Sequence, residues 1–284
     1  MDGLWQWAGP LNALVCLLKG HKMEQKQKLV IKVGTSTLTK GSNRISYAVI
    51  EQLARQILSV RGAYDVILVA SGAIATARQF AEIHQVSTAQ IDSKQALAAI
   101  GQPKLIRIFD EVFGSLGLQV AQCLLTYRDF DNDTARENVK NTLHKLLEFG
   151  YIPIINENDT VAVDEIVFGD NDKLSAYVAI ISGAAILMLV TDIDGIYTQN
   201  PHLHPEARLI EQVAEVEQVK AFIEERENGL GTGGMTSKVY AAELCLRHGL
   251  EMRIVNGNQP DFISGALNGQ FPHTRFNGNL HEPA

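Results

Sequence analysis

Short apolar segments recur along this sequence, each followed by a polar or glycine-containing turn and then by a stretch with helical periodicity. Residues 65–70 and 186–191 are apolar at nearly every position, which is typical of strands buried on both faces of a parallel sheet. Strands that alternate with helices in this way predict an α/β fold, an open, mostly parallel β-sheet sandwiched between α-helices. In that architecture ligands bind where the strands end, so functional motifs are expected there.

The predicted elements follow this alternation to the end of the chain. Strands are predicted at residues 28–33, 65–70, 118–125, 151–156, 186–191 and 251–255, and helices at residues 45–61, 94–113, 133–149, 173–182 and 235–248. A hairpin is predicted at residues 159–168, and the polar segment from His273 to Ala284 is expected to be a frayed end.

One globular domain is predicted at residues 28–276, between a leader of uncertain origin at residues 1–27 and a polar tail at residues 277–284. Met23 stands just before a polar lead into the first strand. One hypothesis for the leader is therefore that the natural chain starts at Met23.

Composition favours a small-molecule ligand. With 25 Lys and Arg against 32 Asp and Glu, the chain has a net charge of −7. It therefore lacks the excess of positive charge that is typical of a nucleic-acid-binding protein. No apolar run approaches the ~20 residues of a membrane-spanning helix. Cys16, Cys123 and Cys245 follow neither a metal nor a disulfide spacing. We therefore expect a cytoplasmic protein without a nucleic-acid or membrane partner.

The ends of the first two predicted strands carry groups suited to an anion. Lys32 interrupts an apolar strand, where an ammonium is costly unless it meets an anion or reaches water. Gly34 then lets the backbone turn sharply and approach a ligand. The segment Ser-Gly-Ala at 71–73 opens a helical run and can offer N–H groups to a carboxylate or phosphate. The structural alternatives are a lysine that reaches solvent and a serine that caps a helix.

Two clusters of acidic and amide residues follow apolar segments. They read Asn-Glu-Asn-Asp at 156–159 and Gly-Asp-Asn-Asp at 169–172, and the second one opens a predicted helix. Side-chain donors and acceptors should therefore converge on one rim of the sheet. The alternating spacing of a calcium-binding loop is missing. Ordinary turn formation is the remaining structural alternative, because Asn, Asp and Gly dominate turns.

A glycine-rich segment at residues 229–238 contains the pattern G-x-G-x-x-G. The dinucleotide-binding fingerprint requires a strand directly before these glycines, whereas residues 221–228 are charged and read as helical. What remains is a glycine loop that leads into a helix carrying Thr236, Ser237 and Lys238, which suits phosphate oxygens. Thr191 and Asp192 end another apolar strand, where a nucleotide base or ribose could be held.

In their order along the chain, these motifs resemble the amino acid kinase family. They are Lys-Val-Gly-Thr-Ser at 32–36, Ser-Gly-Ala at 71–73, the two acidic clusters, Thr-Asp with Gly-Ile-Tyr at 191–197, and Gly-Thr-Gly-Gly-Met-Thr-Ser-Lys at 231–238. The resemblance covers about residues 28–276 and implies the acetylglutamate kinase-like fold. Within the family it is greatest to the members that use ATP to phosphorylate the γ-carboxylate of L-glutamate, the first step of proline biosynthesis.

The resemblance also implies a role for individual residues. The catalytic residues would be Lys32, Lys238 and Asp172, with Asp172 orienting the two lysines. L-Glutamate would be held by Ser71, Gly72, Ala73, Asp159, Asp170 and Asn171. ATP would contact Lys32, Gly34, Thr191, Asp192, Thr232, Gly233, Gly234, Met235, Thr236, Ser237 and Lys238. Mg²⁺ would be bound mainly through the nucleotide, so no metal site made by the protein is expected.

The residue types agree with this chemistry independently of the resemblance. A carboxylate with a pKa near ~4.3 is already ionised at neutral pH, so the reaction needs neither a general base nor a covalent nucleophile. It does need positive charge, because an anionic substrate must approach an anionic phosphoryl group.

The family further leads us to expect a homo-oligomer and feedback inhibition by proline. Many members of this branch carry an additional RNA-modification-type (PUA) domain, and this sequence stops before one could begin. The alternatives are a kinase for acetylglutamate, carbamate or aspartate, and a non-catalytic ligand sensor built on the same fold. Such a sensor would be expected to have lost one of the lysines or an aspartate. A nicotinamide dehydrogenase would need a strand before Gly229.

Overall fold

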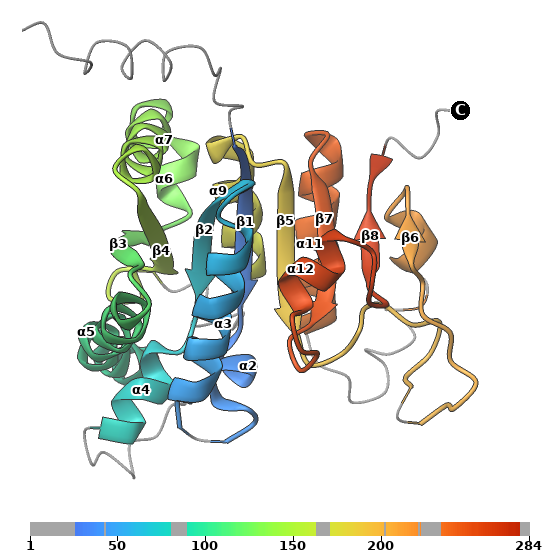
Figure 1. Cartoon of the computed structure of the whole chain (residues 1–284), viewed down its shortest axis with the longest axis horizontal. Helices are drawn as coiled ribbons and strands as arrows, with labels where there is room; N and C mark the ends of the chain where they lie inside the picture. The colour runs from blue at the N-terminus through green and yellow to red at the C-terminus, as the bar shows by residue number, and fades with distance from the viewer. Residues whose placement is uncertain are drawn as a thin grey trace, which may run out of the picture.

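The computed structural model describes residues 26–42, 44–80, 90–162, 171–201, 203–220, 222 and 234–278. These residues form an eight-stranded sheet with the order β3-β4-β2-β1-β5-β7-β8-β6, seen from one face in Figure 1. The strands are β1 (Gln27–Val33), β2 (Tyr64–Ala70), β3 (Gln119–Leu125), β4 (Tyr151–Glu157), β5 (Ile186–Thr191), β6 (Gln212–Val213), β7 (Glu251–Asn256) and β8 (Thr274–Phe276). All neighbouring strands pair in parallel except β7 and β8, which are antiparallel.

Helices cover both faces of the sheet (Figure 1). They are α2 (Thr35–Thr39), α3 (Tyr47–Val60), α4 (Ala73–Phe80), α5 (Ile91–Ser115), α6 (Arg128–Asp131), α7 (Asp133–Glu148), α9 (Asp172–Ser182), α11 (Gly234–Arg247) and α12 (Phe262–Leu267). The predicted α/β sandwich with a mostly parallel sheet is confirmed.

The central strands are buried on both faces because their side chains alternate between two apolar layers. Leu29, Ile31 and Val33 of β1 pack into the layer formed with α3, α5 and α12. Val30 points the other way, into the layer formed with α7, α9 and α11. Because Lys32 has the same parity as Val30, its side chain leaves the sheet on the face covered by α9 and α11.

Predicted and observed elements agree closely where periodicity is strong. The strand predicted at residues 186–191 has the same bounds as β5, and the helix predicted at residues 235–248 is α11, which starts one residue earlier. The helix predicted at residues 94–113 is longer in the structure, running from Ile91 to Ser115 despite Pro103 in its interior. None of the described helices is long and apolar enough to span a membrane.

The prediction of a frayed end from His273 to Ala284 is wrong for its first part. Thr274–Phe276 form β8, which pairs with β7 and β6, and Thr274 and Phe276 are fully buried. Two inward side chains around an outward arginine give the period of a strand, but three residues are too few to show it.

Only part of the hairpin predicted at residues 159–168 can be compared with the structure. Residues 159–162 form a turn in which the backbone N–H groups of Val161 and Ala162 donate to the carbonyl oxygen of Asn158. The other residues of the predicted hairpin lie outside the described ranges.

Candidate active site

Lys32 and Lys238 meet at one buried carboxylate, that of Asp172. The Nζ atom of Lys32 lies 2.7 Å from Oδ1 of Asp172, and Nζ of Lys238 lies 2.9 Å from Oδ2. The Asp172 side chain is fully buried, and the two lysine side chains are only 6% and 12% exposed. One strand and two helices, β1, α9 and α11, therefore bring two ammonium groups to a single point near the carboxyl ends of the strands.

Local structure explains why Asp172 can occupy this position. It is the first residue of α9, where the partial positive charge of the helix N-terminus favours an anion. The hydroxyl of Ser237, in the first turn of α11, also donates to Oδ2 of Asp172, at 3.0 Å. A buried carboxylate is costly unless it is paired and hydrogen-bonded, and here each of its oxygens lies within ion-pair distance of a lysine ammonium.

A cluster of buried amide and hydroxyl side chains adjoins these charges. The Nδ2 atom of Asn171, the residue before Asp172, donates to Oγ of Ser71 at 2.9 Å and to Oδ1 of Asn156 at 2.7 Å. Ser71, Asn156 and Asn171 are all less than 9% exposed. The Oδ1 atom of Asn171 is buried and has no hydrogen-bond partner among the described residues, so it is an acceptor that a ligand N–H group could meet.

Glycines shape the backbone at two of the strand ends. Gly72 has a φ of +114°, a conformation that other residues rarely adopt, and it turns the chain from β2 into Ala73 at the start of α4. A Cβ atom at Gly34 would lie 3.6 Å from Nζ of Lys32. Glycine at this position leaves the space beside the ammonium open.

Asp159 lies two residues beyond the end of β4 and is 8% exposed. Burial raises the pKa of its carboxyl group to about 6, because an apolar surrounding disfavours the charged form. The group thus changes charge near neutral pH, and its charged form would be stabilised by a cationic ligand.

The remaining predicted nucleotide contacts lie on β5 and α11. Thr191 ends β5, and its hydroxyl donates to Oδ1 of the exposed Asp192 at 3.1 Å. Gly234, Met235 and Thr236 form the first turn of α11. Asp170, Thr232 and Gly233 lie outside the described residues.

An aromatic cage holds α9 against α11 beside the candidate site. The Nζ atom of Lys173 lies 4.8 Å from the ring centre of Tyr127, 5.2 Å from that of Tyr240 and 5.9 Å from that of Tyr177. Cation–π attraction at these distances stabilises the packing. Because Lys173 follows Asp172 and Tyr240 follows Lys238 by two positions, the cage fixes the helices that carry two of the three charged groups.

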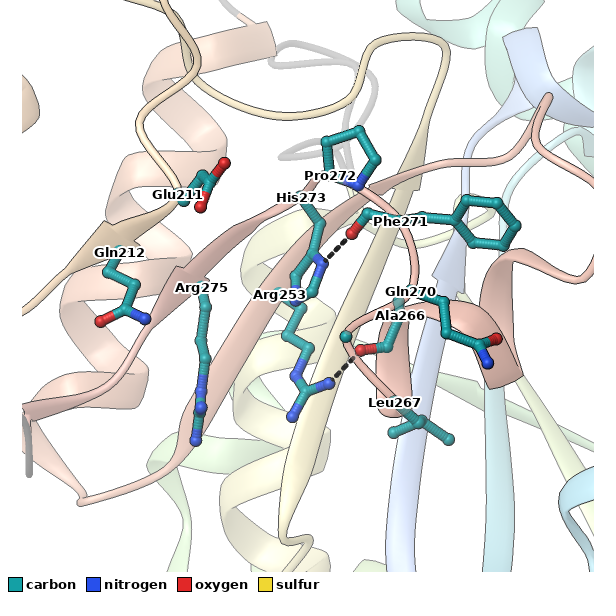
Figure 2. Close-up of a pocket in the computed structure, with 11 residues that line it drawn as sticks. Glu211, Gln212, Arg253, Ala266, Leu267, Gln270, Phe271, Pro272, His273 and Arg275 are labelled. Carbon is teal, nitrogen blue, oxygen red and sulfur yellow. Dashed lines mark hydrogen bonds between the residues drawn. The ribbon is translucent and has the colours of Figure 1, made fainter.

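A separate cavity of about 480 Å³ lies between α12, β8 and β6, and Figure 2 shows its lining. None of the predicted site residues that the structure describes lines it. Its two arginines, Arg253 and Arg275, are both paired with the carboxylate of Glu251, and Arg253 also donates to the carbonyl oxygen of Ala266 (Figure 2). Both arginines are thus held by acceptors of the protein itself, which favours a structural role for this cluster.

Comparison with known proteins agrees with the fold and motifs. A model of the amino acid kinase family matches residues 27–256, and the chain belongs to this family. Among solved structures, UMP kinase from Ureaplasma parvum superimposes with a TM-score of 0.60, over 89% of this chain and 99% of that one. At 18% sequence identity this likeness shows the fold alone.

The similar curated relatives carry a more particular name. The chain is 44% identical over 262 residues to the glutamate 5-kinase of Dehalococcoides mccartyi. It is 43% identical over 258 residues to the glutamate 5-kinase of Photorhabdus laumondii. Each alignment covers 90% of this chain and 70% of the relative.

The structure also shows two contributors to the cluster that the sequence did not identify as site residues. Asn156 belongs to a recognised motif, yet its position between Asn171 and α5 is visible only in three dimensions. Gln102 of α5 accepts a hydrogen bond from Nδ2 of Asn156, but it is one of several polar residues in a long helix and no sequence pattern marks it. The one unusual feature nearby is a glycine before it and a proline after it, inside a helix.

Proposed function

We propose that this chain transfers the γ-phosphoryl group of ATP to the γ-carboxylate of L-glutamate, forming L-glutamyl 5-phosphate in the first step of proline biosynthesis. The observation that supports this most directly is the Lys32–Asp172–Lys238 arrangement at the carboxyl ends of the strands, beside a buried cluster of amides. The relatives named glutamate 5-kinase support the choice of substrate.

In this proposal the two lysines act on the transferred group. An oxygen of the ionised γ-carboxylate attacks the γ-phosphorus of ATP, the bond to the bridging oxygen breaks, and ADP leaves. Lys32 and Lys238 neutralise the negative charges that make the carboxylate and the phosphoryl group repel each other. Asp172 keeps both ammonium groups in place. Electrostatic stabilisation and positioning of this kind provide most of the catalysis in phosphoryl transfer.

The buried amide cluster would hold the amino acid. The Oδ1 atom of Asn171, which has no partner among the described residues, suits the α-ammonium group of glutamate, and Asp159 in its charged form would add an ion pair to the same group. Ser71, Gly72 and Ala73 would receive a carboxylate at the start of α4, where backbone N–H groups are available. Asp170 completes this proposed set.

ATP would lie across β5 and α11. The 14-residue helix α11 begins at Gly234, and its N-terminus together with Met235, Thr236 and Ser237 would face the phosphates. Thr232 and Gly233 would extend this contact, with Gly34 on the opposite side. Thr191 and Asp192 would lie along the base or ribose.

The metal would reach the site with the nucleotide. Within the described ranges no group of three or more His, Cys, Asp and Glu side chains could hold a metal ion, and both oxygens of Asp172 face lysines. Mg²⁺ bound to the phosphates would supply further neutralisation of their charge, which matches its preference for retaining water and phosphate ligands.

One assay tests the substrate directly. ATP consumption is measured with glutamate, acetylglutamate, aspartate and carbamate in parallel, with hydroxylamine present to trap an acyl phosphate as the hydroxamate. We expect hydroxamate with glutamate and little with the others. If glutamate gives no hydroxamate while another substrate does, the assignment is wrong.

Three further expectations rest on the same function. A cytoplasmic location would supply both ATP and free glutamate. Assembly into a homo-oligomer can be measured by light scattering. Inhibition by proline can be measured by adding proline to the glutamate assay.

A further inference from the structure

Helix α5 crosses the start of α4 without any intervening side chain. A Cβ atom at Gly101 would lie 1.8 Å from the carbonyl oxygen of Ala73 and 2.8 Å from the backbone nitrogen of Ala77. Only glycine permits such a crossing. The backbone of α5 therefore touches the first turn of α4, which begins two residues after Ser71.

This crossing brings the next residue of α5, Gln102, to the end of β4. The Oε1 atom of Gln102 accepts a hydrogen bond from Nδ2 of Asn156 at 2.8 Å. Asn156 has the same parity as Ile152 and Ile154, which pack into the layer that contains α5. Its side chain therefore leaves the sheet toward Gln102.

Backbone geometry decides which end of the Asn156 amide is the oxygen. The backbone N–H of Glu157 points at Oδ1 of Asn156, at 2.9 Å, and a backbone N–H group can only donate. Oδ1 is thus fixed as the acceptor, and the Nδ2 donor must face Gln102.

The same logic fixes Asn171 on the other side of the strand ends. Its Nδ2 atom donates to Oδ1 of Asn156 and to Oγ of Ser71, which uses both of its hydrogens. Of the Asn171 amide, this leaves the Oδ1 atom for a ligand, and it is the buried acceptor without a partner among the described residues. A chain of amides thus runs from α5, past the end of β4, to the residue before α9.

From this chain we propose that Gln102 is a positioning residue of the amino acid site: it holds Asn156, and through it Asn171, in the orientation that presents Oδ1 of Asn171 to the substrate ammonium group. The inference rests on the proposed function, since it names the group of the substrate that this site recognises. The hydrogen bond of Gln102 goes to Asn156 rather than to the charged groups, so in this proposal it acts on substrate binding rather than on the transfer step.

The required property of residue 102 is an acceptor at the Oε1 position. Gln102→Met keeps the length of the side chain and removes the acceptor, whereas Gln102→Glu keeps an acceptor in the same place. Gln119 at the exposed amino end of β3, far along that strand from the site, provides a matched control as Gln119→Met.

The experiment compares steady-state kinetics of these full-length variants in the hydroxamate assay. For Gln102→Met we expect the KM for glutamate to rise about 10-fold or more, with kcat at saturation and the KM for MgATP within about threefold of wild type. Gln102→Glu should stay within about threefold of wild type in all constants, and Gln119→Met should not differ from wild type. Circular dichroism at the assay temperature shows whether each variant is folded.

The possible outcomes separate the proposed function from the positioning role of Gln102. An inactive wild-type protein with glutamate would overturn the proposed function. An active wild type with an unchanged KM in Gln102→Met overturns the positioning role alone, as does an equal rise in KM for Gln102→Met and Gln102→Glu. If Gln102→Met does not fold, Gln102→Ser takes its place, because the serine side chain is polar but too short to reach Asn156. Its KM for glutamate is then compared with that of Gln102→Glu.

Discussion

Asp172 and Glu251 each lie between two cationic side chains, but Asp172 lies near the carboxyl ends of the strands of the sheet and Glu251 near their amino ends. Asp172 opens α9 near the carboxyl ends of the strands, and its partners are Lys32 and Lys238. Glu251 opens β7 at an amino end, and its partners are Arg253 and Arg275. The two clusters have the same formal charge, so charge alone does not distinguish a site for chemistry from a structural one.

The type of cation and the surrounding groups make the difference. A lysine ammonium has three donors around one compact charge and can be shared between a carboxylate and an anionic ligand. The fork of Arg253 is already directed to Glu251 and to the carbonyl oxygen of Ala266. Beside Asp172 lies a buried acceptor without a partner in the described part of the chain, on Asn171. We infer that the first cluster is built for a ligand and the second for the fold.

The largest expected effect comes from removing one lysine. Lys32→Ala or Lys238→Ala should lower kcat by about 100-fold or more while leaving the protein folded, because in the proposed function each ammonium stabilises charge that develops in the transition state. Kinetics with glutamate and MgATP measure this loss, and Arg275→Ala is the matched control, expected to change kcat by less than about twofold. A loss below about tenfold, roughly 1.4 kcal/mol of barrier, would contradict the role of the lysines.

The next effect concerns stability and compares the two carboxylates. Asp172→Asn leaves two nearly buried ammonium groups without a counter-charge and should lower the free energy of unfolding by about 3 kcal/mol. Glu251→Gln should cost about 1–2 kcal/mol, since the Arg275 side chain is 35% exposed and is partly stabilised by water. Urea denaturation followed by circular dichroism measures both. Equal costs would mean that the two clusters do not differ as described.

A third carboxylate, Asp159, sharpens the comparison through pH. Burial raises its pKa to about 6, so it is protonated in more molecules as the pH falls through that value. The KM for glutamate should then rise by up to about tenfold per pH unit below pH 6, if the charged form binds the substrate ammonium. Asp159→Asn should have a high KM that varies little over the same range, and a parallel slope in both proteins would exclude Asp159 as its cause.

The same carboxyl group also predicts the sign of a stability change. Between the unfolded pKa of about 3.9 and the folded value of about 6, the folded state binds more protons than the unfolded state, so stability decreases as the pH rises. Asp159→Asn should flatten this decrease. Urea denaturation at pH 4, 5, 6 and 7 measures it, and an increase in stability attributable to Asp159 over this range would contradict the raised pKa.

The smallest effect is expected at an exposed pair of the same chemistry. Glu51 and Arg55 lie one turn apart on α3, and their side chains are 48% and 63% exposed. A double-mutant cycle with alanine should give a coupling of about 0.2–0.5 kcal/mol, reduced further by salt. A coupling as large as that at Asp172 would mean that burial is not what separates these clusters.

The sequence was sufficient for the fold and for part of the candidate site. The first strand could be predicted from its apolar residues, and Lys32 could be singled out because a lysine within such a strand is costly unless it meets an anion or reaches water. Asp172 and Lys238 are 66 positions apart, and only the resemblance to a family suggested their pairing. No local pattern reports a contact of that separation.

Other features could not be predicted, for identifiable reasons. The Gln102 contact depends on a helix crossing set by Gly101, and a single glycine within a helix does not say which backbone it approaches. The β8 strand was missed because Thr274 owes its burial to distant groups: its hydroxyl accepts from the N–H of Ile196 and donates to the carbonyl oxygen of Ile210.

The unequal edges of the sheet have a consequence for the behaviour of the protein at high concentration. One edge is closed by β6 and β8, strands of two and three residues, which provide few backbone groups for another chain to pair with. The opposite edge is β3, a seven-residue strand with Leu124 38% exposed. Long edge strands are the usual template for chain-to-chain pairing, so a lysine introduced at position 124 should reduce aggregation more than any change at the short edge.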